Sequence, residues 1–219
     1  MTVVAREPAR LPRAAPVNPT EYGDWSLRPV QAPDVPMLYE WVMDPRVNHR
    51  WTTRGMLIPY DKFAQRIWDD VLVNLLVHDG SQQPLAWATL TSVDLHSGHC
   101  SAAVVVDPQQ PKAAAIGPRT VCLMLRYAFA IYPFRKIYFE SPEFAVRDFR
   151  TALGRLLTVE GILTEHLYYA GRHWDMYILG MTAQRWAGVG QPYMERVFRG
   201  CREPAEGQTR SASSARAAR

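Results

Sequence analysis

The stretch over residues 100–129 constrains the fold of this chain more than any other. Its first part, Cys100–Val106, is small and β-branched, which is typical of a buried strand. The segment Asp107–Gly117 follows as a turn and loop rich in proline, glutamine, alanine and glycine. Apolar residues then recur with helical spacing over Pro118–Ile131. Pro118 suits the first turn of a helix, because the N–H that proline lacks has no partner there.

A strand, a loop of small residues and a helix N-terminus together indicate an anion site. The first N–H groups of a helix have no partner within it, and the positive end of the helix dipole lies at the same place. Lys112 stands in this loop and would add a positive charge. The pattern therefore predicts a phosphate site, and an ordinary strand–loop–helix connection is the alternative that it leaves open.

Length and charge predict one folded domain with basic tails. A chain of 219 residues, 47% of them hydrophobic, is long enough to bury a full core. We expect a disordered arm over residues 1–20, a domain over 21–199 and a disordered Ser/Ala/Arg tail over 200–219. The two tails each sum to +2 and so carry the whole net charge of +4. The nearly neutral core argues against a nucleic-acid-binding face.

The sequence favours a reduced, cytoplasmic protein. No run of about 18 apolar residues predicts a membrane span, and no apolar segment follows the arginines near the N-terminus as in a secretory signal. Three cysteines, Cys100, Cys122 and Cys201, show no C-x-x-C spacing and indicate free thiols. No constellation of metal ligands is apparent either, so no metal is expected.

The periodicities predict a mixed α+β chain. An antiparallel meander precedes the opening stretch, and a strand parallel to Cys100–Val106 follows it, because a strand–helix–strand unit implies a parallel pairing. The predicted strands are 25–30, 72–78, 84–93, 100–106 and 136–141, with a final hairpin of 162–169 and 173–179 around Ala170-Gly171. The predicted helices are 34–43, capped by Asp34, then 61–71, 118–131 and 143–157, with one short helix over 193–198.

Three segments resemble the GNAT superfamily of acyl-CoA-dependent N-acyltransferases. WSLRPVQAPDVPMLYEWVMDPRV resembles the opening strand and helix of the RimJ/RimL-type, ribosomal-protein-acetyltransferase-like branch. VVVDPQQPKAAAIGPRTVCLMLRYAF resembles the fourth strand, pyrophosphate loop and third helix of the family, and VEGILTEHLYYAGRHWDMYILGM its terminal hairpin. The resemblance spans residues 25–186. It implies the GNAT fold: a mixed, mostly antiparallel central sheet flanked by helices, with a parallel splay around the acyl-CoA loop.

The resemblance also implies the reaction and its co-substrate. It implies direct transfer of an acyl group, in the first place acetyl from acetyl-CoA, to a primary amine. The amine would belong to a small molecule or a peptide, and a homodimer is compatible with the resemblance. A backbone N–H near Val105 or Val106 would bind the thioester oxygen. The pyrophosphate would meet the start of the helix, over residues Lys112, Ala113, Ala115, Ile116, Gly117, Pro118 and Arg119.

Four side chains are the catalytic candidates. Asp94 and His99 lie in the turn before the Cys100–Val106 strand, and a histidine has a pKa suited to a base. Ser101 stands where the family often has a glutamate base and would orient a water. Tyr177, on the last hairpin, would protonate the leaving thiolate. The alternatives are solvated turn residues for the first two, a small buried strand residue for Ser101 and ordinary packing for Tyr177.

Departures from the family pattern keep other functions open. Ala115 occupies a position where the family usually has glycine, and residues 143–150 contain neither the tyrosine nor the asparagine of the family. A second hypothesis is therefore a GNAT-fold protein that binds acyl-CoA or another ligand without catalysis, as a regulatory or binding module. A third is an interaction module whose basic tails recruit a partner. The tryptophans 41, 51, 68 and 87 either wall an acceptor pocket or fill the core.

Overall fold

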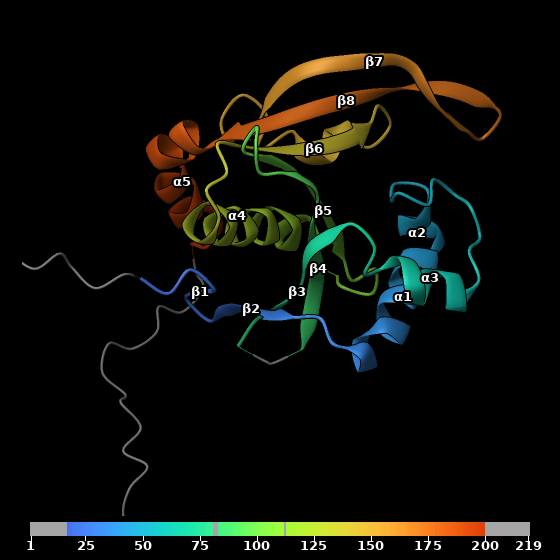
Figure 1. Ribbon diagram of the computed structural model, residues 1–219, viewed down its shortest axis with the longest axis horizontal. Helices are drawn as coiled ribbons and strands as arrows, with labels where there is room; N and C mark the ends of the chain where they lie inside the picture. Colours follow the sequence, from blue (N-terminus) through green and yellow to red (C-terminus); the bar gives the residue numbers. More distant parts are fainter. Residues whose placement is uncertain (1–16, 81–82, 112, 200–219) are drawn as a thin grey trace, which may run out of the picture.

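The computed structural model describes residues 17–80, 83–111 and 113–199 and contains one eight-stranded sheet (Figure 1). In spatial order, the strands are β1 (Glu21–Tyr22), β2 (Trp25–Pro29), β3 (Val71–His78), β4 (Pro84–Asp94), β5 (His99–Val106), β6 (Lys136–Pro142), β8 (Arg172–Thr182) and β7 (Thr158–Tyr169). All neighbours are antiparallel except β5 and β6. This confirms the predicted mixed, mostly antiparallel sheet with its meander, its parallel pair and its terminal hairpin.

Helices cover both faces of the sheet. The α-helices are α1 (Val35–Met43), α2 (Pro45–Asn48), α3 (Tyr60–Arg66), α4 (Ala113–Ile131) and α5 (Ala183–Val197), with 3-10 turns η1 (Ala32–Asp34) and η2 (Val146–Phe149). Figure 1 shows α4 and α5 on one side of the strands β3 to β5 and α1, α2 and α3 on the other.

Strand alternation divides the core into two. On β4, Ala86, Ala88 and Leu90 pack in the main cluster with α4 and α5, whereas Trp87 packs in the second cluster with α1 and α3. On β5, Cys100 and Ala102 belong to the main cluster and Val105 to the second. From Trp87 to Thr91 of β4 and from Ser101 to Val105 of β5, the odd-numbered residues therefore point toward α1–α3, the side on which a cavity lies.

The helix after β5 begins earlier than predicted. Ala113–Gly117, expected to be loop, form the first turns of α4, and Pro118 lies inside the helix. Alanine is the strongest helix former, so the run Ala113–Ala115 extends the helix backward. A proline disfavours helical geometry in the residue before it, partly because its ring clashes with the Cβ of that residue. Gly117 has no Cβ, so Pro118 can follow it inside the helix. The prediction that Pro118 starts the helix was wrong.

The predicted helix over residues 143–157 is not formed. The segment contains only η2 and a series of turns. The carbonyl of Ala152 accepts hydrogen bonds from the N–H groups of both Leu156 (2.7 Å) and Leu157 (2.9 Å), and Gly154 takes a φ of 73°. The apolar spacing correctly marked buried residues, since Leu156 and Leu157 are fully buried. No helix continues through the segment, because the backbone of Gly154 lies in the left-handed region.

Three boundaries also differ. The predicted helix over 61–71 ends at Arg66, and Val71 already belongs to β3. The predicted short helix over 193–198 is the second half of α5, which the Thr182 hydroxyl caps by accepting from Arg185 N at 3.1 Å. Asp34 does not cap α1 with its side chain; it closes η1 instead, accepting from Gln31 N at 2.8 Å.

The folded part begins a few residues before the predicted boundary. The carbonyl of Thr20 accepts from Leu27 N at 2.8 Å, and that of Asn18 accepts from the Arg126 guanidinium at 2.9 Å. These residues were expected to belong to the disordered arm. The rest of that arm, residues 1–16, and the predicted tail over 200–219 lie outside the described residues.

Helix α4 is long and apolar enough, by length and composition, to cross a membrane. Its buried residues include Val121, Cys122, Leu123, Met124 and Leu125, which all belong to the main core cluster. A core helix that packs against a sheet passes the same compositional test. The packing therefore accounts for the apolar character of α4.

Candidate functional site

The pairing of β5 and β6 stops after three residues and leaves a gap. His99 pairs with Lys136, Cys100 with Ile137 and Ser101 with Tyr138. Beyond Ser101, β5 continues to Val106 and β6 continues to Pro142, but no further pairing between these two strands is described. One edge of β5 is thus open over its second half, and a strand-like ligand could pair with its backbone there.

The register decides which backbone groups of β5 face this gap. The N–H of Asp107 donates to the carbonyl of Leu85 at 2.9 Å, so the pair 85/107 is hydrogen-bonded. Hydrogen-bonded pairs alternate along an antiparallel ladder, so Val105 and Ala103 also bond to β4. The N–H groups of Val104 and Val106 consequently point into the gap.

This register refines one prediction and adds a residue to the site. Of the two predicted oxyanion donors, Val106 faces the gap, whereas the N–H of Val105 is turned toward Trp87 on β4. Val104 was missed by sequence reasoning. The alternation of the strand was recognised from the sequence, but its phase relative to β4 depends on the register, which only the structure supplies.

The N-terminus of α4 follows the loop at the end of β5. The N–H groups of its first three residues, Ala113–Ala115, have no partners within the helix, and Ala113 and Ala115 are exposed. Ile116 is buried, and the N–H of Gly117 meets the carbonyl of Ala113 in helical geometry. Pro118 has no N–H. Among the predicted phosphate contacts, Ala113–Ala115 are therefore the residues with free N–H groups, and Lys112 lies outside the described residues.

The Arg119 side chain packs between elements of the fold. Its Nε donates to the carbonyl of Val197 at 2.8 Å, and its guanidinium lies 5.3 Å from the centre of the Trp25 ring and 5.9 Å from that of Phe198. These contacts join α4 to α5 and β2. The predicted pyrophosphate contact of Arg119 was its backbone N–H, which lies beyond the first turn of α4 and meets the carbonyl of Ala115 in helical geometry.

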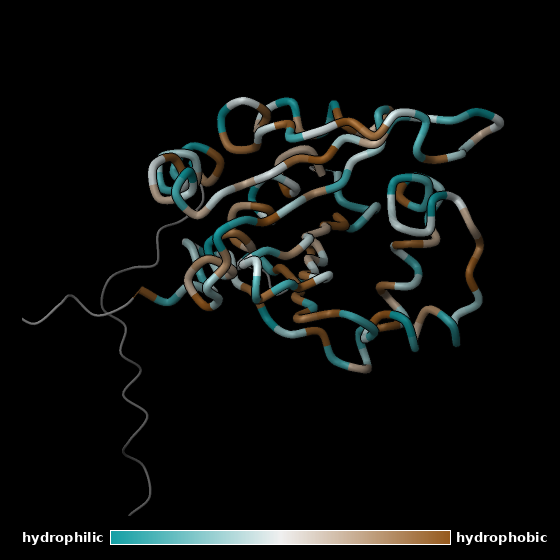
Figure 2. Tube along the Cα trace, turned by 45° about the horizontal axis from the view of Figure 1, so that its top comes forward, coloured by the Kyte–Doolittle hydropathy of each residue, from teal (hydrophilic) through white to brown (hydrophobic). Residues whose placement is uncertain are grey.

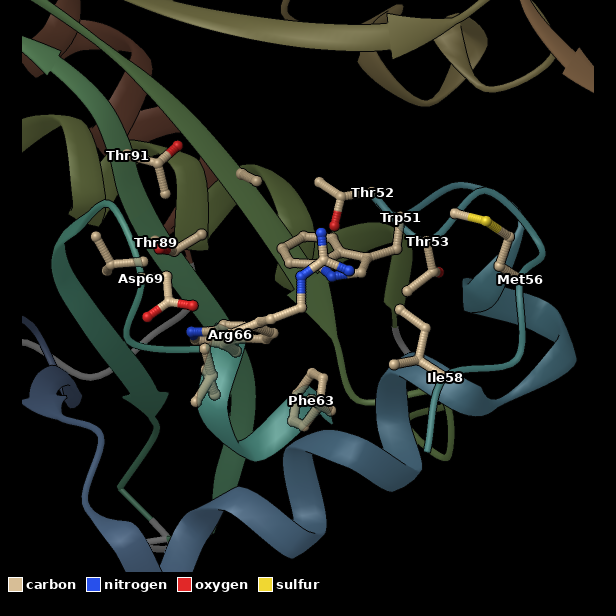
Figure 3. A pocket seen from close by; sticks show the side chains of 14 residues that line it. Trp51, Thr52, Thr53, Met56, Ile58, Phe63, Arg66, Asp69, Thr89 and Thr91 are labelled. Atoms are coloured by element: carbon tan, nitrogen blue, oxygen red, sulfur yellow. The ribbon is translucent and has the colours of Figure 1, made fainter. Parts of the chain in front are cut away.

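A cavity of about 350 Å³ lies on the opposite face of the sheet from α4, under α3 and the loop that precedes it (Figure 3). Ala103 links it to the gap: its side chain lines the cavity, while the backbone of the next residue, Val104, faces β6. The lining residues are Trp51, Thr52, Thr53, Met56, Ile58, Phe63, Arg66, Ile67, Asp69, Val71, Trp87, Thr89, Thr91 and Ala103.

The floor of the cavity carries hydroxyl groups. Thr89 stands opposite Ala103 and Thr91 opposite Ser101, so all four side chains share one face of the sheet. The Thr89 side chain is only 5% exposed, and its hydroxyl has no hydrogen-bond partner among the described residues. Buried polar groups are nearly always paired, so an unpaired hydroxyl in a cavity wall indicates a place for a ligand or a water.

Two aromatic side chains form the rigid part of the wall. The rings of Trp51 and Trp87 lie 5.0 Å apart, and Trp87 Nε1 donates to Asn74 Oδ1 at 3.0 Å. Of the four tryptophans proposed as pocket or core, these two line the cavity. Trp41 is buried in the second core cluster, and Trp68 is 46% exposed.

Arg66 and Asp69 are the charged side chains of the lining. Neither forms an ion pair with any other described residue. Figure 3 shows the Arg66 side chain extending across the cavity toward Trp51, with the Asp69 carboxylate on the other side of it. Sequence reasoning missed both, because it placed them in a helix and they reach the cavity only where that helix ends early.

Asp94 and His99 lie together at the closed end of the gap. His99 Nε2 is 3.7 Å from Asp94 Oδ2. The pKa of Asp94 is lowered, first of all by the hydrogen bond that Oδ1 accepts from Ser97 N at 2.9 Å. His99 pairs with Lys136 of β6, and the pairing of the two strands ends at Ser101. The distance along β5 from His99 to Ala103, where the cavity meets the gap, is about 13 Å.

Ser101 and Tyr177 occupy different surroundings. Ser101 is half-buried beside Thr91, on the same face as the cavity, and is the predicted catalytic residue that the structure places nearest to it. Tyr177 lies on β8 opposite Ser141 of β6 and packs against the main core. Since β6 stands between β5 and β8, Tyr177 is separated from β5 by one strand.

Known structures share this architecture. A spermidine N-acetyltransferase from Vibrio cholerae, solved with CoA and spermine, superposes with a TM-score of 0.64 at 18% identity, over 75% of this chain and 98% of that one. A chimera of the same enzyme with hSSAT gives a TM-score of 0.62 at 16% identity, over 79% of this chain and 99% of that one. A putative acetyltransferase gives 0.67 at 15% identity, over 84% of this chain and 96% of that one.

These likenesses establish the fold. The chain has the fold of the N-acetyltransferase structures that it matches, as the resemblance of its sequence predicted. No protein-family model matches the sequence, and no curated protein matches it. The place within the RimJ/RimL-type branch stays a prediction.

Proposed function

We propose that this protein is an acyl-CoA-dependent N-acyltransferase that transfers an acyl group, in the first place acetyl, directly to a primary amine. The observation that carries the proposal is the open edge of β5 beside the cavity, with Ala103 common to both. The shared fold supports it, since a matched structure is an N-acetyltransferase in complex with CoA and spermine. We also propose the cytoplasm as its compartment, because Cys100 and Cys122 are free thiols.

The residues of the gap fit an acyl-CoA. The N–H groups of Val104 and Val106 would bind the amide groups of its pantetheine arm and the thioester oxygen, as the edge of a sheet binds an added strand. The free N–H groups of Ala113–Ala115 would bind the pyrophosphate. When bound, the co-substrate supplies the activated acyl carbon.

The cavity would hold the acceptor so that its nitrogen reaches the gap at Ala103. The amine must be neutral to react, and its lone pair then forms the new C–N bond as the C–S bond of the thioester breaks. The thiolate that leaves takes up the proton that the amine loses, through water. Thr91, on the cavity floor, and Ser101, opposite it on the same face, would order that water. Asp94 and His99, at the closed end of the gap, would act through further waters.

Binding without catalysis is the second candidate function. The strand residues under the cavity, Thr89 and Thr91, carry hydroxyls, the one carboxylate of the lining is that of Asp69, and Ser101 stands where the family often has glutamate. A protein with the same gap and cavity would then bind acyl-CoA as a regulatory module. The two candidates share the ligand and differ in turnover.

A thiol-release assay separates them. The protein is incubated with acetyl-CoA and a panel of primary amines, and the free CoA thiol and the mass of the acylated product are both measured. We expect thiol release that depends on the amine, with one product per thiol. If the protein binds acetyl-CoA but releases no thiol with any amine, it is a binding module and not an acyltransferase. If it does not bind acetyl-CoA, both functions are excluded.

A further inference from the structure

The charges of the cavity point to a chemical class of acceptor, an inference that rests on the proposed function. Arg66 and Asp69 give the lining one positive and one negative charge, and every other lining side chain is uncharged. A site whose charges sum to zero in this way complements a ligand with one charge of each sign. We propose that the acceptor is an aminocarboxylate: an amine with an aromatic or large aliphatic body and a single carboxylate.

The walls select the body of this acceptor. Trp51, Phe63 and Trp87 enclose the cavity together with Met56, Ile58 and Ile67. Phe63 and Trp87 meet edge to face with ring centres 6.3 Å apart, and the rings of Trp51 and Trp87 are tilted, with centres 5.0 Å apart. Burial of an apolar side chain against these rings releases water from both surfaces, whereas a polar body would be desolvated without partners.

Arg66 supplies the site for the carboxylate. Its guanidinium has no acidic partner among the described residues, and Arg66 is an exposed residue at the end of α3, so its charge is free to meet a ligand. Its side chain extends across the cavity in Figure 3. A guanidinium matches a carboxylate with two parallel hydrogen bonds, which fixes the orientation of a ligand as well as its affinity.

The amine would lie at the other side of the cavity. Thr89, whose hydroxyl is buried and unpaired, stands beside Ala103 and so beside the gap. Asp69 offers the negative charge that attracts an ammonium before it loses its proton. The hydroxyl can accept from the ammonium and then from the neutral amine, so it stays hydrogen-bonded in both states.

The same charges disfavour a polyamine. The matched Vibrio cholerae enzyme is a spermidine N-acetyltransferase. A polyamine carries several ammonium groups, and this cavity has one carboxylate to receive them, next to a guanidinium that repels them. The shared fold therefore does not carry the acceptor of that enzyme over to this chain.

The test compares acceptors that differ in one group. Thiol release from acetyl-CoA is measured with phenylalanine, with 2-phenylethylamine, which lacks only the carboxylate, and with spermidine. We expect kcat/KM for phenylalanine to exceed that for 2-phenylethylamine by about tenfold or more, the usual contribution of a hydrogen bond between charged groups, with spermidine lowest. A preference for spermidine, or equal values for the first two, would overturn the proposal.

Variants locate the effect. Arg66→Gln should lower kcat/KM for phenylalanine by about ten- to a hundredfold and leave 2-phenylethylamine within about twofold. Arg147→Gln is the matched control, because Arg147 is exposed on η2, outside the cavity, and should change neither value. An equal loss for both amines in Arg66→Gln would mean that Arg66 does not recognise the carboxylate.

Binding separates this inference from the proposed transfer. N-acetylphenylalanine is titrated calorimetrically into wild-type protein and into Arg66→Gln, without acyl-CoA. Binding by the wild type that Arg66→Gln weakens, together with no turnover of any amine, would support the site and refute the transfer. Turnover of 2-phenylethylamine without binding of N-acetylphenylalanine would support the transfer and refute the aminocarboxylate.

Discussion

At the scale of single residues, the Thr89 hydroxyl is the clearest sign that the cavity is made for a ligand. It is buried without a partner in the described structure, so its removal costs the fold no hydrogen bond. We predict that Thr89→Val changes the free energy of unfolding by less than about 1 kcal/mol and raises the KM for the amine about fivefold. Urea unfolding and thiol-release kinetics measure the two effects.

Thr120 is the matched control for this prediction. Its hydroxyl is also buried and without a partner in the described structure, but it lies on α4, on the other face of the sheet. Thr120→Val should change stability by as little as Thr89→Val and leave the KM unchanged. Equal KM values for the two variants would show that the Thr89 hydroxyl does not contact the acceptor.

The buried thiols predict how stability depends on pH. Burial raises the pKa of Cys100 from 9.0 to about 12 and raises that of Cys122 further. The unfolded chain releases these protons above about pH 9, while the native protein keeps them, so the free energy of unfolding falls as the pH rises. Urea unfolding at pH 7, 8.5 and 10 should show this fall, and a Cys100→Ala/Cys122→Ala variant should show less of it.

At the scale of elements, an aromatic cluster joins the loop after α2 to the hairpin of β7 and β8. The rings of His49, Phe144 and Tyr169 are in mutual contact, with His49 5.7 Å from each of the other two and those two 5.6 Å apart. Arg50 forms an ion pair with Asp148. Figures 1 and 2 both show the tip of the hairpin above α2. A Cβ on Gly55 would lie 2.8 Å from the Tyr169 ring, so this loop packs closely against the hairpin.

This cluster holds the loop that carries Trp51. Phe144→Ala removes its contacts with His49 and Tyr169 and an edge-to-face contact with Trp174 at 5.0 Å. We predict a loss of about 1–3 kcal/mol in the free energy of unfolding and a higher KM for the amine, because the cavity wall becomes mobile. Tyr168→Ala, at an exposed position of the same hairpin, should have neither effect. Hydrogen exchange of residues 49–56 and thiol-release kinetics check this.

The sequence predicted the elements with long, regular patterns and missed those decided by single residues. The meander, the parallel pair and the terminal hairpin follow from alternation and from the Ala170-Gly171 turn, where both residues have positive φ. The start of α4 depended on whether Gly117 tolerates the proline after it. In the segment over 143–157, the apolar residues have helical spacing because they are buried, but the turns around Gly154 form no helix.

At the scale of the whole molecule, the site could be predicted only in part. The proposed acyl-CoA contacts, Val106 and Ala113–Ala115, lie within one continuous stretch, so the sequence alone could propose them, and they stay predictions. The acceptor side brings together Trp51, Arg66 and Thr89 from separate elements. No pattern in the sequence relates them, because their proximity results from the packing of α3 and its loop over β4. Asp94 and His99 were favoured by residue type, and the structure places them at the closed end of the gap, where β5 and β6 are paired.

The central claim is that an acyl-CoA pairs with the open edge of β5. Val106→Pro removes an N–H that faces the gap and no bond to β4, and proline is tolerated on an open strand edge. Val105→Pro removes a ladder bond and should destabilise the protein instead. The deciding measurement is calorimetric titration of acetyl-CoA. We predict binding by the wild type and at least about fivefold weaker binding by a folded Val106→Pro; no binding by the wild type, or equal binding by the two proteins, would contradict the account.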